Sequence, residues 1–319
     1  TFTYIYNMMS NRREFIQSFS AALTSPFLIS SSELIGTGKT LKASLSPGAI
    51  GLKCTANELL DYAIKYKFSA ISPPITELIQ FKETDKKAYL EKMVKNKIIF
   101  DSGGLPIQFR TTDSKFKEGY DFLLKNIDSI VSLNITSFVT WIMPTHKTLP
   151  YMKNFEQHKT RLTKVATILE DAGLKLGLEY VGPKTLMARD KYPFLHSALG
   201  LRELIGAIGK NNVGYLLDSY HTYCAEDKNE DLNFLKAEDI ISVQLNDGVL
   251  GRTVATQMDL ERELPGDTGI IDLKNFLNLI RNKGYKGAVS VEPFNKELNK
   301  MEVGAKLKRV RASLSKFDI

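Results

Sequence analysis

From about residue 42 onward, short aliphatic runs alternate with polar loops and with segments whose apolar residues recur at helical spacing. In the stretch 162–169, leucine, valine, alanine and leucine fall at positions i, i+3, i+4 and i+7, and Gly173 then ends the pattern. The stretch 273–280 repeats this arrangement and ends at Gly284. Because one face of each segment is apolar, each predicts a helix that packs on a buried layer.

The aliphatic runs between these helices predict strands. A chain in which strands alternate with helices predicts a parallel α/β protein, and eight such units most simply form a closed (β/α)8 TIM barrel. An open doubly wound sheet is the alternative, but it more often carries a glycine-rich phosphate loop, and "SLSPGAIGLK" matches one poorly. We therefore expect a single barrel domain over residues 39–319. Its predicted strands lie near residues 42–46, 68–72, 105–109, 137–142, 174–179, 213–218, 240–246 and 287–292.

Residues 1–38 do not follow this pattern, and we exclude them from the barrel. Arg12 and Arg13 precede Phe15 and Ile16, and a weakly apolar stretch and a serine cluster follow. This arrangement resembles a twin-arginine export signal, which implies a periplasmic protein; without a functional signal the protein would be cytoplasmic. The stretch is too short and too polar for a membrane span, and a surface amphipathic helix is the alternative.

The composition is that of an ordinary globular protein, with 43% hydrophobic and 25% charged residues among 319. The net charge of +7 is spread along the chain except near the C-terminus, where Lys306, Lys308, Arg309, Arg311 and Lys316 cluster. We interpret this cluster as a solvated helix face and expect no nucleic-acid partner. The two cysteines show no zinc-binding spacing.

The predicted fifth to eighth strands each carry a polar residue at or near the carboxyl end. Side chains alternate faces along a strand, and in the fifth, seventh and eighth strands the large aliphatic residues share one face. In the sixth strand, Asp218 lies on the same face as Gly214 and Leu216. In the seventh strand, for example, Ile241 belongs to the aliphatic face, which should pack on the outer helices. The polar face should then point into the barrel, at the end where barrel enzymes build their sites. The four inward-pointing residues are Glu179, Asp218, Gln244 and Glu292.

Three converging carboxylates repel one another, and buried charge without a partner is costly. A cation between them is the economical solution. All four donors are oxygens if the amide oxygen of Gln244 is counted, so the pattern predicts one divalent ion, Mn²⁺ first, with Mg²⁺ or Co²⁺ as alternatives. A lone strand-end carboxylate is more often a cap or an ion-pair member, and Asp218 with Ser219 would suit a helix N-cap. The recurrence on four successive strands is what favours a metal site.

The segments "GLEYVGPKTL", "VGYLLDSYH", "ISVQLNDG", "ELPGDTGIIDLKNFL" and "GYKGAVSVEPFN" together resemble the sugar phosphate isomerase/epimerase family of the xylose isomerase-like TIM barrel superfamily. The resemblance covers most of residues 42–295, and "GLPIQFR" (104–110) resembles the family's third strand. Members bind one divalent metal, often manganese, through Glu, Asp, His and Glu on strands five to eight. The resemblance thus implies Glu179, Asp218 and Glu292 as ligands, while Gln244 stands where the family has histidine.

The resemblance also implies the chemistry: proton abstraction next to a carbonyl of a small carbohydrate, through a metal-stabilised enediolate. Glu179 and Glu292 would be the catalytic residues that remove and return the proton. His221 matches a position that contacts substrate in the epimerases. Further candidate substrate contacts, for which a solvated or structural role is the alternative, are Arg110 at the end of predicted strand three, His146, Trp141 as an apolar wall, and Arg252 and Arg262 in the loop after strand seven.

Other outcomes of the same site stay open. A dehydratase or lyase acting on a keto-sugar or keto-glycoside would begin with the same proton abstraction. A catalytically silent sugar-binding barrel is a further alternative, because Gln244 replaces the histidine ligand of the family pattern. An abasic-site endonuclease of the same superfamily would need a histidine-rich trinuclear zinc site, and this chain has four histidines. Self-association into a homo-oligomer is also open.

Overall fold

Parallel strands form a sheet that closes on itself in the computed structural model, which describes residues 41–319. The predicted export signal, residues 1–38, lies outside these residues. The order in the sheet is β3-β2-β1-β11-β10-β9-β7-β5-β4. Its outermost members, β3 and β4, are two parts of one segment, 99–104, so the sheet closes as a barrel and the predicted TIM barrel fold is confirmed. The strands are β1 (Lys42–Leu45), β2 (Ala70–Ile71), β3 (Ile99–Phe100), β4 (Gly103–Gly104), β5 (Ser137–Ile142), β7 (Lys175–Tyr180), β9 (Val213–Asp218), β10 (Ile240–Leu245) and β11 (Ala288–Val291).

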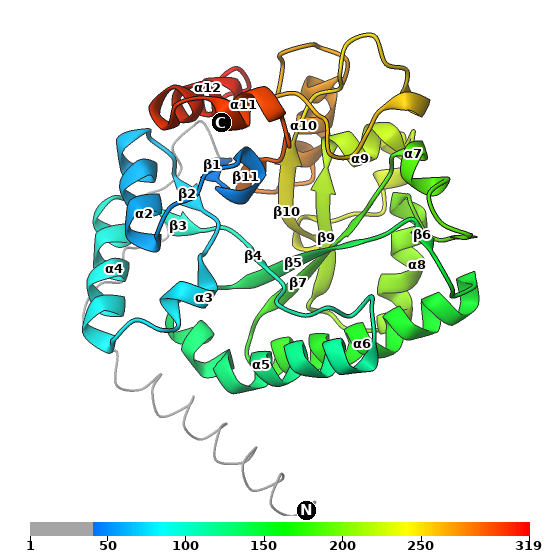
Figure 1. The fold of residues 1–319 in the computed structure, drawn as a ribbon, viewed down its shortest axis with the longest axis horizontal. Helices are drawn as coiled ribbons and strands as arrows, with labels where there is room; N and C mark the ends of the chain where they lie inside the picture. Colours follow the sequence, from blue (N-terminus) through cyan, green and yellow to red (C-terminus); the bar gives the residue numbers. More distant parts are fainter. Residues whose placement is uncertain (1–40) are drawn as a thin grey trace, which may run out of the picture. The chain divides into compact units, whose positions relative to one another are not determined.

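Helices surround these strands, and Figure 1 shows α4, α5, α6 and α8 on the outside of the sheet. The two helices predicted from periodicity are confirmed as α6 and α10, whose apolar faces are buried. A short antiparallel pair, β6 (Thr145–His146) with β8 (Tyr192–Pro193), lies apart from the barrel sheet. The helices are α2 (Ala56–Lys65), α3 (Ile75–Leu78), α4 (Glu83–Lys95), α5 (Asp113–Ser132), α6 (Tyr151–Asp171), α7 (Lys184–Met187), α8 (Ala198–Ile208), α9 (Ser219–Cys224), α10 (Leu273–Asn282), α11 (Lys296–Lys300) and α12 (Val303–Ser315), with short 3₁₀ turns η1 (Gly48–Ile50), η2 (Asn229–Leu232), η3 (Ala237–Asp239) and η4 (Val254–Thr256).

The third strand lies earlier in the chain than the sequence predicts. It comprises β3 and β4, whereas residues 105–109 form the loop that follows, with Ile107 and Phe109 buried. This loop packs closely on α5, where a Cβ on Gly119 would lie 2.7 Å from the carbonyl oxygen of Pro106. Consequently Arg110 is not at a strand end but in the loop just before Thr112, the N-cap of α5.

The seventh barrel strand contains an irregularity that reverses one predicted orientation. The pairing of β10 with β9 shifts register between Ile240 and Ser242. A Cβ on Gly177 would lie 3.1 Å from the Cβ of Ile241, and one on Gly214 would lie 3.0 Å from its Cγ1. Gly177 and Gly214 belong to the inward faces of β7 and β9, so Ile241 points into the barrel and not onto the outer helices.

The basic C-terminal cluster is not simply a solvated face. Lys306 is buried and donates to the carbonyl oxygens of Gly51 and Asn299. Arg309 and Lys316 both form ion pairs with Asp267 at 2.9 Å. These contacts fasten α12 to the barrel. Among the helices of residues 41–319, none has an apolar stretch long enough to cross a membrane.

Candidate functional site

The barrel brings the four predicted strand-end residues together. Asp218 is the last residue of β9 and pairs in register with Gln244 of β10. Glu179 is the penultimate residue of β7, and Glu292 directly follows β11. The side chains of Asp218 and Glu179 are 0% and 9% exposed, so their charges are almost fully removed from solvent.

The amide of Gln244 lies between two carboxylates. Its terminal amide group is 3.1 Å from both Glu292 Oε2 and Asp218 Oδ2. The NH₂ of Gln244 faces these oxygens and donates to both. Gln244 therefore takes part in the site although it departs from the histidine of the family pattern.

Arg262 supplies a positive charge to the same carboxylates. Its Nη1 lies 3.0 Å from Asp218 Oδ2 and 3.5 Å from Glu292 Oε2, and its side chain is 1% exposed. On the other side, its Nη2 donates to Asp259 Oδ1 and its Nε to the Asp259 carbonyl, both at 2.7 Å. Burial alone would lower the pKa of Arg262, but the surrounding carboxylates outweigh it and raise the pKa. The guanidinium is therefore charged, and it offsets part of the repulsion that the sequence assigned to an ion alone.

Asp218 both caps a helix and faces the site. Its Oδ1 accepts from the backbone N–H of Tyr220 at 2.6 Å, which makes it the N-cap of α9. Its Oδ2 accepts from Asn246 Nδ2 at 2.8 Å. Asn246 in turn accepts from the backbone N–H of Glu292 through Oδ1 at 2.7 Å, so one buried amide links the two acidic residues. The cap interpretation of Asp218 is thus confirmed, and its second oxygen faces the carboxylate cluster.

His221 of α9 is buried beside this cluster. Its Nδ1 faces the backbone N–H of Gly182 at 3.3 Å, and its Nε2 faces Arg262 Nη2 at 3.3 Å, so both ring nitrogens lie against donors. Nε2 lies 3.7 Å from both Glu179 Oε1 and Asp259 Oδ1. Burial, and then the charge of Arg262, hold the pKa of His221 well below its usual range. The ring is therefore neutral.

The three carboxyl groups of the cluster have raised pKa values. Burial raises the pKa of Glu179 well above its usual range, and the charges of Glu292 and Asp218 raise it further. Burial also raises the pKa of Asp218, against the opposing charge of Arg262. For Glu292, burial raises the pKa to about 7 although Arg262 lowers it. Paired carboxyl groups with shifted pKa values are typical of sites that exchange protons.

The residues present fit a divalent ion. Glu179, Asp218 and His221 each offer a ligand atom, and these atoms lie within 4.8 Å of one another. The 3.1 Å spacing between the Gln244 amide end and the two carboxylate oxygens is also suitable. Adjacent oxygens of an octahedral ion lie about 3 Å apart when metal–oxygen distances are about 2.1 Å. Turning the Gln244 amide would present its oxygen to such an ion.

Trp141 lies near this cluster, and the Arg110 side chain packs on the Trp141 ring. Trp141 of β5 pairs in register with Glu179 of β7, and its side chain is 46% exposed although it shares the inward face of the strand. The guanidinium of Arg110 lies 4.1 Å from the indole ring centroid and donates to the Trp141 carbonyl at 2.7 Å. Burial lowers the pKa of Arg110 to about 10. The role of Trp141 as an apolar wall for the substrate stays a prediction.

Two other candidate substrate contacts are engaged elsewhere. His146 of β6 accepts from the backbone N–H groups of Thr148 and Leu149 through Nδ1, which shapes its own loop. Arg252 forms an ion pair with Glu261 of the same loop. None of the contacts that the structure describes joins either side chain to the carboxylate cluster.

Sequence reasoning missed Asn246 and Asp259, two residues of the cluster. Asn246 could have been found, because it shares the inward face with Gln244 by strand parity. Asp259 could not, since it lies in an irregular loop and its role depends on Arg262. Phe294 has a positive φ of 44°, unusual for a non-glycine residue, and its ring lies 5.3 Å from the Arg262 guanidinium.

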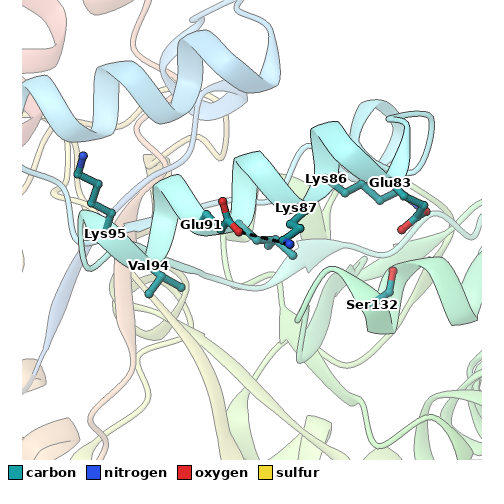
Figure 2. A pocket seen from close by; sticks show the side chains of 8 residues that line it. Glu83, Lys86, Lys87, Glu91, Val94, Lys95 and Ser132 are labelled. Carbon is teal, nitrogen blue, oxygen red and sulfur yellow. Dashed lines mark hydrogen bonds and ion pairs between the residues drawn. The ribbon is translucent and has the colours of Figure 1, made fainter. Parts of the chain in front are cut away.

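A separate surface groove lies on the outer helices. It has a volume of about 530 Å³ and is lined by α4 side chains, such as Lys87 and Val94, and by Ser132 of α5. Figure 2 shows the Lys87–Glu91 ion pair along its edge. None of its lining residues belongs to the carboxylate cluster.

The fold and the cluster define the class of protein: a (β/α)8 barrel with an acidic site at the carboxyl ends of its strands. The family described as xylose isomerase-like TIM barrel matches residues 60–315, and the chain belongs to this family. The resemblance inferred from the sequence is thereby confirmed.

Individual relatives are more distant. An inosose isomerase from Halalkalibacterium halodurans is 28% identical over 151 residues, which cover 47% of this chain and 50% of that protein. The chain spans about half the length of the curated relatives it matches. A xylose isomerase domain protein from Alicyclobacillus acidocaldarius has a TM-score of 0.75 and 27% identity, covering 87% of this chain and 98% of that one. A structure of the IOLI protein with a bound zinc atom has a TM-score of 0.72 over 87% of this chain and 99% of that one, and at 20% identity it shows the fold alone.

Proposed function

We propose that this protein is a metal-dependent sugar isomerase or epimerase that moves a proton at a carbon next to a carbonyl. The observation that carries the proposal is the convergence of Glu179, Asp218 and Glu292, with His221, at the carboxyl ends of the barrel strands. The curated relatives named inosose isomerases support the same reaction class. The barrel fold supports the location of the site.

Glu179 and Glu292 carry the proton in this proposal. They come from different strands, β7 and the end of β11, so they can flank a substrate that enters the barrel mouth. One carboxylate removes the proton, and the other returns it to the opposite face or to the neighbouring carbon. Return to the opposite face gives an epimer, and return to the next carbon gives an aldose–ketose isomer.

The remaining residues hold the substrate and the carboxylates. His221, buried beside Glu179 and Asp259, forms a hydrogen bond with a substrate oxygen. Arg262 donates a hydrogen bond to Asp218. Asn246 holds the Asp218 carboxylate and the Glu292 backbone in place. Trp141 offers an apolar face on which a sugar ring can pack.

A divalent ion, with Mn²⁺ the first choice, would be held by Glu179, Asp218, Gln244 and Glu292. When bound, such an ion polarises the carbonyl and stabilises negative charge on the substrate oxygens. An oxygen-rich donor set suits Mn²⁺ or Mg²⁺ better than zinc.

The proposal is tested with purified protein and Mn²⁺, incubated with a panel of keto-sugars, inososes and keto-glycosides in heavy water. Deuterium at carbon in a recovered isomer or epimer is the expected result, and excess chelator should abolish it. An unsaturated or cleaved product would assign the dehydratase or lyase reaction instead. Binding of a sugar with no exchange of any panel member would identify a silent binding barrel and refute the proposal.

A further inference from the structure

The Oδ2 oxygen of Asp218 has no room for another partner. Oδ1 accepts from the Tyr220 N–H at 2.6 Å. Oδ2 accepts from Asn246 at 2.8 Å and from Arg262 Nη1 at 3.0 Å, and the Gln244 amide lies 3.1 Å away. A carboxylate oxygen has two lone pairs, so three neighbours already saturate Oδ2. Any further ligand at this oxygen must displace one of them.

Of these neighbours, Arg262 is the one that an arriving cation would displace. Asn246 is completely buried and is also bonded to the Glu292 backbone, so it is fixed at both ends. The Gln244 amide can turn and present its oxygen. The guanidinium can do neither, because it has only donors and carries the same sign of charge as a metal ion.

We propose that Arg262 Nη1 and a divalent cation compete for Asp218 Oδ2 and Glu292 Oε2, so that the cation binds only when this guanidinium nitrogen leaves them. This inference rests on the divalent-ion site of the proposed function. Nη1 is close to both oxygens, at 3.0 and 3.5 Å. The same two oxygens flank the Gln244 amide. The guanidinium of Arg262 thus occupies the oxygens that the cation would use.

Release of Nη1 does not require the whole loop to open. Nε and Nη2 remain bonded to Asp259, at 2.7 Å each. The guanidinium also lies 4.8 Å from the Tyr220 ring centroid and 5.3 Å from that of Phe294. Because the guanidinium is planar and rigid, Nη1 leaves the carboxylates when the whole group tilts about its Nε–Nη2 edge, which stays on Asp259, and its freed N–H groups become donors for a substrate oxygen. Binding of the cation would then free Arg262 Nη1 to donate to the substrate.

The affinity for Mn²⁺ tests this competition without any turnover. Trp141 is the only tryptophan of the chain and pairs in register with Glu179, so quenching of its fluorescence by Mn²⁺ reports occupancy. The variants are Arg262→Gln and Arg262→Lys, and the control is Arg309→Gln, which breaks an arginine–aspartate pair of 2.9 Å on α12. Folding of each is checked by circular dichroism.

Arg262→Gln should bind Mn²⁺ about ten- to a hundredfold more tightly than wild type, the range of one charge-assisted hydrogen bond. Arg262→Lys should also bind more tightly, by about threefold to tenfold, although its charge is unchanged. A single ammonium cannot hold Asp259 and Asp218 at the two places that Nη2 and Nη1 occupy. Arg309→Gln should bind like wild type.

Each other outcome has a distinct meaning. Equal Mn²⁺ affinity in wild type and Arg262→Gln overturns the competition. Tighter binding by Arg262→Gln with wild-type affinity in Arg262→Lys reduces the effect to charge alone and overturns the displacement. Absence of Mn²⁺ binding in all proteins overturns the metal site of the proposed function itself.

A measurement on the wild-type protein covers the case in which the variants do not fold. The guanidinium nitrogens of a buried, ion-paired arginine give separate NMR signals because rotation is slow. Addition of Mg²⁺ should shift or broaden the Nη1 signal of Arg262 and leave its Nε signal in place. An Nη1 signal that does not respond while Mg²⁺ binds would overturn the proposal.

Discussion

Asn246 is the structural link between the two acidic strand ends, and Asn246→Ala tests that role. The side chain is 0% exposed, donates to Asp218 Oδ2 at 2.8 Å and accepts from the Glu292 N–H at 2.7 Å. Truncation removes one hydrogen bond to a charged group, about 1.5–3 kcal/mol, and one neutral bond of about 1 kcal/mol. It also leaves the Glu292 N–H without its partner. We expect the free energy of unfolding to fall by about 3 kcal/mol or more.

The measurement is urea unfolding at neutral pH in the presence of chelator, with the slope m compared between variants. The control is Asn229→Ala, because Asn229 is exposed and bonds only to another exposed amide, that of Asn275. This control should cost less than about 0.5 kcal/mol. Asn246→Asp should cost at least as much as Asn246→Ala, since it would place a carboxylate oxygen against Asp218. If Asn246→Ala is no less stable than Asn229→Ala, the claim that this amide organises the site is refuted.

Two further variants test how buried groups and close contacts shape the barrel. His158 is 2% exposed, and burial lowers its pKa to about 4. As the pH falls, the unfolded chain therefore protonates at this histidine before the folded protein does. The free energy of unfolding should thus decrease by up to about 3 kcal/mol between about pH 6.5 and pH 4. His158→Leu should flatten this part of the pH dependence of urea unfolding, and an unchanged slope would contradict the assignment. A Cβ on Gly182 would overlap the His221 carbonyl oxygen and lie 2.9 Å from Ala225 N, so Gly182→Ala should lower the unfolding free energy by about 1–3 kcal/mol. Gly206→Ala, in α8 with nothing within 4 Å of the added Cβ, should raise it by about 0.5–1 kcal/mol; equal effects of the two changes would show that the close approach is absent.

Strand parity was enough to predict where the carboxylates converge. Glu179, Asp218 and Glu292 lie on regular strands, or directly after one, and their inward orientation follows from the two-residue period. The same rule failed at Ile241 because a register shift after Ile240 reverses one residue, and no hydrophobic pattern marks that shift. It also failed for the third strand, because β3 and β4 are two short pieces around Asp101 and Ser102 and have little alternation to recognise.

The part of the site that the sequence could not provide comes from a loop. Arg262 is 44 residues from Asp218 along the chain, and the loop that carries it has no periodicity from which its position could be predicted. The sequence therefore assigned the neutralising charge to an ion, and Arg262 only to a possible substrate contact. The contacts to Asp259 and Asp218 show why the side chain reaches the barrel mouth.

The most direct test of the proposed function is the rate of deuterium incorporation at carbon, with Mn²⁺ and the best substrate of the panel in heavy water. Glu292→Gln should slow the exchange by about a hundredfold or more, the usual contribution of a positioned acid–base group. The matched control is Glu297→Gln on α11, whose side chain is 77% exposed and pairs only with Lys300; it should exchange like wild type. Exchange by Glu292→Gln at the wild-type rate would contradict the assignment of Glu292 as a proton carrier.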